Sequence, residues 1–150
     1  MFKENTHDIV IKSDLASVRY EILWWGEAVW WPQNSLMRFV RLTERPLQKG
    51  TRYKQEVTLP FTPSWEVEID NLTDTSITRR FLNGMFAGFE TVGLINRPSG
   101  VEVSYRMHYE VQGILNNILW FFVFQSMHDK NIELILESLK DYLEKGKKEE

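Results

Sequence analysis

The last third of the sequence constrains the fold more than any other part. Residues 113–145 carry apolar side chains at spacings of three and four, which is the pattern of one long amphipathic helix. Such a helix would be about 50 Å long, whereas a chain of this size has a radius of gyration of only about 15 Å. We therefore expect irregular first turns near Gly113 or Asn116-Asn117, a continuous helix over about 117–144 and a frayed tail over 145–150.

The segments before this helix have the pattern of strands. Residues 65–70 and 101–111 alternate strictly between apolar and polar side chains, as antiparallel strands with one buried face do. Further segments alternate less strictly, and short turns separate them. This favours a meander, because parallel pairing needs crossovers of about a dozen residues or more.

The N-terminal part adds a strand and helical segments. A short strand over 8–11 precedes two stretches with helical spacing, 15–25 and 27–31, which Gly26 separates. The predicted fold class is α+β, in a single domain over residues 1–150. In this fold two short helices follow the first strand, and a bent antiparallel sheet of about seven strands wraps around the long C-terminal helix.

The composition excludes several functional classes. A net charge of −3 leaves no electrostatic footprint for nucleic acid. With no Cys and only three widely spaced His residues, we expect no metal, and no motif predicts a cofactor. The N-terminus lacks the apolar core of a signal peptide, and the longest apolar run, residues 118–124, is too short to span a membrane. We expect a cytoplasmic protein without stable membrane insertion.

Aromatic residues are frequent, with six Trp, five Tyr and nine Phe. They either fill a core or line a cavity for an apolar ligand, and composition leaves both open. Strand alternation places a mostly apolar set with a few hydrogen-bonding groups on the inward faces, as in a small-molecule site. These inward residues are Tyr53, Gln55, Trp65, Tyr105 and Tyr109. Trp31 and its neighbours Trp24, Trp25 and Trp30 either line that space or plug it.

The C-terminal helix contributes polar candidates. Spacings of three and four place Phe121, Phe124 or Gln125, and His128 on the line that faces the sheet. Because His titrates near neutral pH, His128 is a candidate polar handle for a ligand or a proton shuttle. The alternative is a buried His whose ring bonds a neighbouring hydroxyl or carbonyl. His7 and His108 are expected at the surface.

Arg79 and Glu90 are a candidate charged pair for the inside of the sheet. Arg79 shares its strand face with Ile77 and Phe81, and a buried Arg needs a partner. Glu90 on the next strand is the candidate partner. Both faces of strand 85–95 are apolar, so the pattern leaves open which side points inward, and a structural or exposed Arg-Glu pair remains the alternative.

Several local motifs accompany this order of elements. Trp30-Trp31-Pro32 follows the first helix, Gly50 separates two strands, and Leu59-Pro60-Phe61 precedes another. Gly84-Met85-Phe86-Ala87-Gly88 spaces two glycines along a strand, and Ser126-Met127-His128-Asp129 places a His-Asp pair in the last helix.

Together these motifs resemble the START-like superfamily, also called SRPBCC or Bet v 1-like. Within it, the chain is most similar to the polyketide cyclase/dehydrase and lipid-transport group. The sequence departs from that pattern at Val92, where relatives frequently carry Trp, and at Met127, where they often carry Asn before His. The resemblance implies a helix-grip fold with a cavity between the bent sheet and the final helix.

The resemblance also implies a function. The expected activity is binding, as a carrier or sensor, of a hydrophobic or amphipathic small molecule such as a lipid, isoprenoid or polyketide-like compound. The candidate ligand-binding residues are Trp31, Tyr53, Gln55, Trp65, Arg79, Glu90, Tyr105, Tyr109, Phe121, Gln125 and His128.

Two further hypotheses remain open. In one, the protein is a cyclase or dehydratase in which His128 acts as acid or base, helped by Arg79 or a Tyr. In the other, it is a protein-interaction adaptor with Trp30, Trp31 and Phe122 in an exposed patch.

Overall fold

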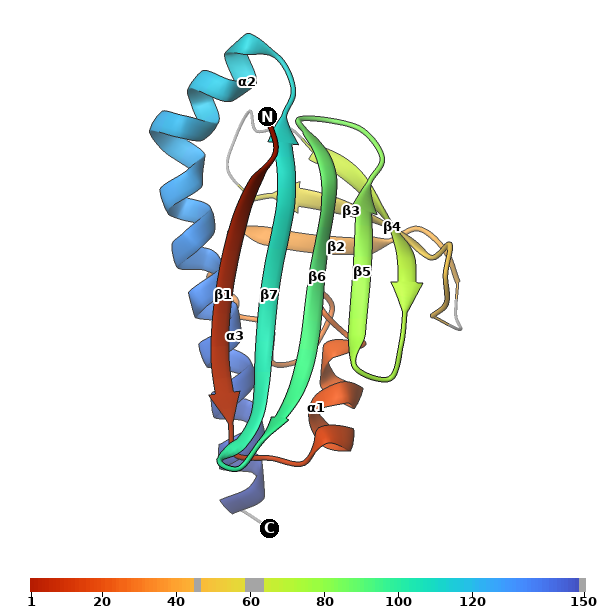
Figure 1. Cartoon of the computed structure of the whole chain (residues 1–150), viewed down its shortest axis with the longest axis vertical. Helices are drawn as coiled ribbons and strands as arrows, with labels where there is room; N and C mark the ends of the chain where they lie inside the picture. The colour runs from red at the N-terminus through yellow and green to blue at the C-terminus, as the bar shows by residue number, and fades with distance from the viewer. Residues whose placement is uncertain (45–46, 59–63, 149–150) are drawn as a thin grey trace.

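The computed structural model describes residues 1–44, 47–58 and 64–148 (Figure 1). The Leu59-Pro60-Phe61 motif lies outside these residues. The elements in chain order are β1 (Lys3–Ile11), α1 (Leu15–Ile22), β2 (Met37–Arg41), β3 (Arg52–Val57), β4 (Ser64–Leu72), β5 (Ser76–Phe81), β6 (Phe86–Arg97), β7 (Gly100–Val111), α2 (Ile114–Leu119), the π-helical turn η1 (Trp120–Phe124) and α3 (Gln125–Lys148).

The strands form one antiparallel sheet in the order β1-β7-β6-β5-β4-β3-β2. The predicted meander is confirmed for β2 to β7, and β1 joins it at the β7 edge. The sheet bends strongly, so that β2 and β3 run across the direction of β1 and β7 (Figure 1). This bend produces the concave face that the C-terminal helix covers.

Two irregularities accompany the bend. The register between β4 and β5 shifts between Ile69 and Asn71, and such bulges increase local twist. On β6, Gly88 lies opposite Tyr109 with φ +118, and a Cβ there would lie 2.0 Å from the carbonyl oxygen of His108. Glycine is therefore required at Gly88, because any side chain would separate β6 from β7.

One short helix follows the first strand, not two. The segment 23–31 forms turns instead of the predicted second helix. Gly26 adopts φ +84 against the Phe39 ring, and the Trp30 indole donates to Glu21 at 2.9 Å. Trp25 packs edge-on against both Trp30 and Trp31. The free energy gained by burying these rings outweighs the weak helix propensity of so short a segment.

The C-terminal helix is continuous through α2, η1 and α3 and runs beside β1 (Figure 1). It begins at Ile114, and its irregularity lies at residues 120–124 instead of near Asn116-Asn117. There the Gln125 N–H donates to the Trp120 carbonyl, five residues back. The predicted end near Glu144 is also wrong, because α3 continues to Lys148.

The core lies between the helix and the concave face. Ile132, Ile135 and Leu139 of α3 are fully buried against it, as are Val103 and Tyr105 of β7. At the far end, Lys140 of α3 donates to the Val10 carbonyl at 3.1 Å. Within the described residues, no helix has a stretch long and apolar enough to cross a membrane.

Gly88→Ala should lower the free energy of unfolding by about 1–3 kcal/mol, because it forces a positive φ on an L residue and pushes Cβ into the β7 backbone. Gly93→Ala on the same strand is the matched control, since its nearest neighbouring atom would be 4.0 Å away. Urea unfolding of both variants measures the difference. Equal stabilities would show that close approach at Gly88 does not shape the sheet.

Candidate functional site

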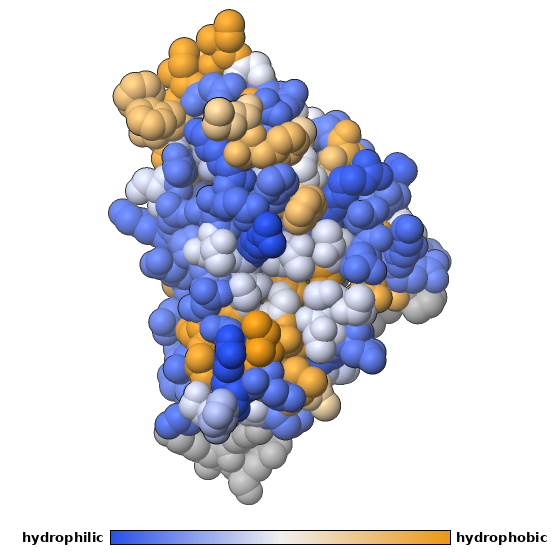
Figure 2. Space-filling view, in the orientation of Figure 1, coloured by the Kyte–Doolittle hydropathy of each residue, from blue (hydrophilic) through white to orange (hydrophobic). Residues whose placement is uncertain are grey.

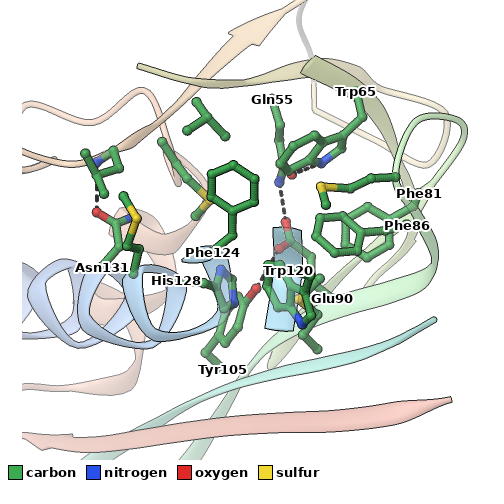
Figure 3. Close-up of a pocket in the computed structure, with 16 residues that line it drawn as sticks. Gln55, Trp65, Phe81, Phe86, Glu90, Tyr105, Trp120, Phe124, His128 and Asn131 are labelled. Carbon is green, nitrogen blue, oxygen red and sulfur yellow. Dashed lines mark hydrogen bonds between the residues drawn. The ribbon is translucent and has the colours of Figure 1, made fainter. Parts of the chain in front are cut away.

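A pocket lies between the concave face of the sheet and the helix (Figure 3). The cavity has a volume of about 50 Å³, and further space at its mouth is open to solvent. The lining residues are Leu36, Met37, Gln55, Val57, Trp65, Phe81, Met85, Phe86, Glu90, Tyr105, Met107, Trp120, Phe124, Met127, His128 and Asn131.

The wall of the pocket is apolar and deformable. Four of the five Met residues in the sequence line it: Met37, Met85, Met107 and Met127. Unbranched thioether side chains change rotamer at little cost, so such a wall adapts to the shape of a ligand. A drug-sized ligand requires this adaptation, because pockets of that class measure about 300–1,000 Å³ and the enclosed space is narrow.

A chain of hydrogen bonds crosses one wall and ends on a buried carboxyl (Figure 3). The Trp65 indole donates to Gln55 Oε1, and Gln55 Nε2 donates to Glu90 Oε1 at 2.9 Å. The Tyr105 hydroxyl donates to Glu90 Oε2 at 2.9 Å. These four residues come from β4, β3, β6 and β7, so the chain ties together strands that are far apart in the sheet.

The electrostatics of Glu90 follow from its burial. Loss of solvent raises the pKa of Glu90, while the charge of Arg79 and the bonds from Tyr105 and Gln55 oppose that rise. Burial also raises the pKa of Tyr105 well above its usual range, so its hydroxyl remains a donor.

Arg79 lies behind this wall instead of in the pocket. It is fully buried and pairs with Glu90 in the β5–β6 register, which rules out an exposed pair. Its guanidinium lies over the rings of Phe39 and Tyr53, at 5.6 and 5.3 Å from their centroids. Its nitrogens make no well-formed hydrogen bond among the described residues, but the guanidinium lies close enough to the Tyr53 hydroxyl to oppose the rise that burial causes in the pKa of Tyr53. Its influence on the site is electrostatic, through Glu90.

His128 enters the pocket from α3. Its ring lies 5.9 Å from that of Tyr105 and 5.5 Å from that of Trp120, and its Nε2 is buried with no hydrogen-bond partner among the described residues. Burial lowers the pKa of His128 from 6.5 to about 4, the charge of His7 adds to that shift and Asp129 opposes it. The imidazole is therefore neutral at physiological pH.

Asn131 lies one turn further along and was missed by the sequence analysis. It is 4% exposed, and its Oδ1 accepts the Leu36 N–H at 2.9 Å. Its Nδ2 is buried and has no hydrogen-bond partner among the described residues. The spacing of three from His128 was visible in the sequence, but a single Asn on an apolar face gave no functional signal.

Of the residues predicted to line the site, five meet in the pocket: Gln55, Trp65, Glu90, Tyr105 and His128. Others are buried outside it. Tyr109 accepts a hydrogen bond from the Trp120 indole at 3.1 Å, and Tyr53 stacks with Arg79. Trp31 is partly buried; it packs against Phe39 and donates to the Met37 carbonyl, so it lies outside the pocket, as do the buried Trp25 and Trp30.

Two positions on the helix were predicted incorrectly. Phe121 is 66% exposed, and Gln125 is only partly buried and does not line the pocket. At the wider turn of η1, Trp120 and Phe124 line the pocket; the sequence pattern placed Phe124 on the inward line as the alternative to Gln125 but did not place Trp120 there. The described residues contain no cluster of His, Cys, Asp or Glu suited to a metal ion.

The neutral state of His128 predicts a pH dependence of stability. Because the pKa of His128 is lower in the folded state, the unfolded chain binds more protons than the folded chain below about pH 6.5. The contribution of His128 to the free energy of unfolding is therefore complete above that pH and is lost as the pH falls toward 4. Between pH 7 and pH 4, the wild type should lose roughly 2–3 kcal/mol more than His128→Gln. Urea unfolding at several pH values tests this. Parallel pH profiles would contradict it.

Comparison with known proteins identifies the fold alone. No family model matches the chain, and no curated protein matches its sequence. Among solved structures, TTHA0849 from Thermus thermophilus is 14% identical with a TM-score of 0.74, over 96% of this chain and 99% of that chain.

Two similar structures are named enzymes. Norcoclaurine synthase from Thalictrum flavum, in complex with dopamine and hydroxybenzaldehyde, is 9% identical with a TM-score of 0.70, over 97% of this chain and 88% of that chain. The ZhuI aromatase/cyclase from Streptomyces sp. R1128 is 10% identical with a TM-score of 0.68, over 94% and 96%. The chain thus has the Bet v 1-like helix-grip fold that its sequence motifs predicted.

Proposed function

We propose that the protein binds a hydrophobic or amphipathic small molecule in the pocket between the sheet and the C-terminal helix. The observation that carries this proposal is the wall itself: apolar, rich in Met, and interrupted by a few fixed polar groups. Lipids, isoprenoids and polyketide-like compounds share the required chemistry. A protein with the same fold holds dopamine and hydroxybenzaldehyde, which supports a ligand of small aromatic size.

The rim of the pocket offers an entrance. Leu36, Val57, Phe124, Met127 and His128 line the pocket and are each partly exposed, whereas the residues deeper in the wall are buried. All but His128 are apolar. Within the described part of the lining, a ligand therefore enters past flexible and aromatic side chains.

A carrier or sensor is favoured over a cyclase or dehydratase. An acid–base role for His128 at neutral pH is weakened because burial lowers its pKa to about 4. Arg79, its expected helper, does not line the pocket. The two oxygens of the Glu90 carboxyl accept hydrogen bonds from Gln55 and Tyr105, so Glu90 is poorly placed to take a proton from a substrate as a general base.

The adaptor hypothesis in its original form is contradicted. Trp30 is only 5% exposed and its indole is bonded to Glu21, while Trp31 is bonded to the Met37 carbonyl. Phe122 is exposed, but it lies on the helix, among other apolar residues of α2 and η1.

Met127→Trp should abolish or strongly weaken binding of apolar ligands, because the larger ring fills the mouth of a narrow pocket. Ser126→Trp is the matched control, since Ser126 is exposed and does not line the pocket. A thermal-shift or native mass spectrometry screen with pools of lipids and aromatic compounds measures both. Ligands that bind Met127→Trp as well as the wild type would place binding elsewhere.

A further inference from the structure

Asn131 presents a donor with a fixed direction. Its Oδ1 accepts the Leu36 N–H, so the amide cannot rotate without losing that bond, and Asn131 lines the pocket with a buried Nδ2 that has no partner among the described residues. A buried donor without a partner costs about 1–3 kcal/mol. The side chain is therefore suited to a ligand atom that accepts a hydrogen bond, with water in its place when the pocket is empty.

The neighbouring groups define the charge of that ligand. Among the described residues, no Lys or Arg lines the pocket, so an anionic group would be buried without a counter-charge. Glu90, the one carboxyl in the described lining, accepts a hydrogen bond from the protein through each oxygen and already has the charge of Arg79 nearby, so it is engaged without a cationic ligand. His128 is neutral and its Nε2 is unbonded within the described part of the chain. An uncharged ligand fits these constraints.

We propose that Asn131 and His128 recognise a neutral oxygen, a carbonyl or a hydroxyl, on a ligand whose remaining body is apolar. Asn131 Nδ2 donates to that oxygen, and His128 Nε2 either donates to it or accepts from a hydroxyl. This inference rests on the proposed binding function and deepens it. The preferred ligands are aromatic or isoprenoid ketones, phenols and alcohols, and not the corresponding hydrocarbons or carboxylates.

The test compares three ligands of one shape: 2-acetylnaphthalene, 2-isopropylnaphthalene and 2-naphthoate. Isothermal titration calorimetry on the wild type should show the ketone binding about tenfold more tightly than the hydrocarbon, and the carboxylate most weakly. In Asn131→Ala the ketone-to-hydrocarbon ratio should fall toward one. A purely structural role of Asn131 would weaken both ligands equally and leave the ratio unchanged, which would overturn the inference.

Asn131→Asp provides a second variant if the alanine variant does not fold. It keeps an oxygen for the Leu36 N–H but replaces the donor, so the preference for the ketone should disappear at neutral pH. If the wild type binds ketone and hydrocarbon equally, the inference fails and the proposed function stands. If neither ligand binds, both are overturned.

A separate observation concerns the outer surface of the helix. Six apolar residues of α2 and η1 are between 44% and 84% exposed: Ile114, Leu115, Ile118, Phe121, Phe122 and Val123. Figure 2 shows hydrophobic residues gathered at the end of the molecule where α2 lies. We call this surface the apolar helix face. It presents on the order of 700 Å² of apolar area, more than the largest patch of a typical monomer.

The composition around the apolar helix face distinguishes between a membrane and a protein as its partner. Residues 111–127 contain no Asp, Glu, Lys or Arg. Helices that lie on anionic membranes carry Lys and Arg on their polar side, whereas here that side holds Asn116 and Asn117, whose amides bond the backbone. The exposed area is close to the roughly 800 Å² per partner of a standard protein interface, and charge is depleted at the centre of such interfaces.

We infer that the apolar helix face pairs with the same face of a second copy of this chain. Sedimentation equilibrium should show a dimer for the wild type and a monomer for Phe122→Glu, while Tyr142→Glu, at an exposed position on α3, should remain dimeric. A monomeric wild type at about 100 µM would overturn the inference. So would a monomer that binds phosphatidylcholine vesicles, which would make the face a membrane contact.

Discussion

The structure depends on the need to cover the concave face of one bent sheet. Two irregularities accompany the bend: the β4–β5 register shifts, and Gly88 lets β6 and β7 approach closely. Of the described helices, only the C-terminal one is long enough to cover the face produced by that bend. Its contact is tight at Ile132 and Leu139, which are fully buried, and looser toward η1, where the pocket opens. The pocket thus forms where the C-terminal helix diverges from the concave face of the sheet.

Polar groups inside the pocket divide into two kinds. Gln55, Glu90 and Tyr105 are joined by hydrogen bonds that link separate strands, so they fix the floor of the pocket. His128 and Asn131, on the helix, each keep a buried nitrogen without a partner among the described residues. The sheet therefore supplies a fixed floor, the Met side chains supply an adaptable wall, and the helix supplies the groups that are free to recognise a ligand.

Local patterns predicted the parts of this structure that local physics controls. Alternation of period two is set by each strand itself, so the meander and the inward faces of Gln55, Trp65 and Tyr105 were accessible from sequence. Packing decided the rest. At a single π-helical turn Phe121 is exposed and Trp120 lines the pocket, and no periodicity announces such a turn. Likewise, the segment after α1 forms turns instead of the predicted helix, and in these turns Trp25 packs against Trp30 and Trp31. Which residues share a cavity depends on this packing.

The indole N–H signals of the six tryptophans test the central claim directly, because they report on different parts of the interior. Trp65 and Trp120 line the pocket, whereas Trp30 is bonded to Glu21 outside it. Two-dimensional ¹H–¹⁵N NMR spectra recorded during titration with 2-acetylnaphthalene should show saturable shifts at Trp65 and Trp120 and none at Trp30. Saturable binding that leaves the Trp65 and Trp120 signals in place would contradict a ligand site between the sheet and the helix.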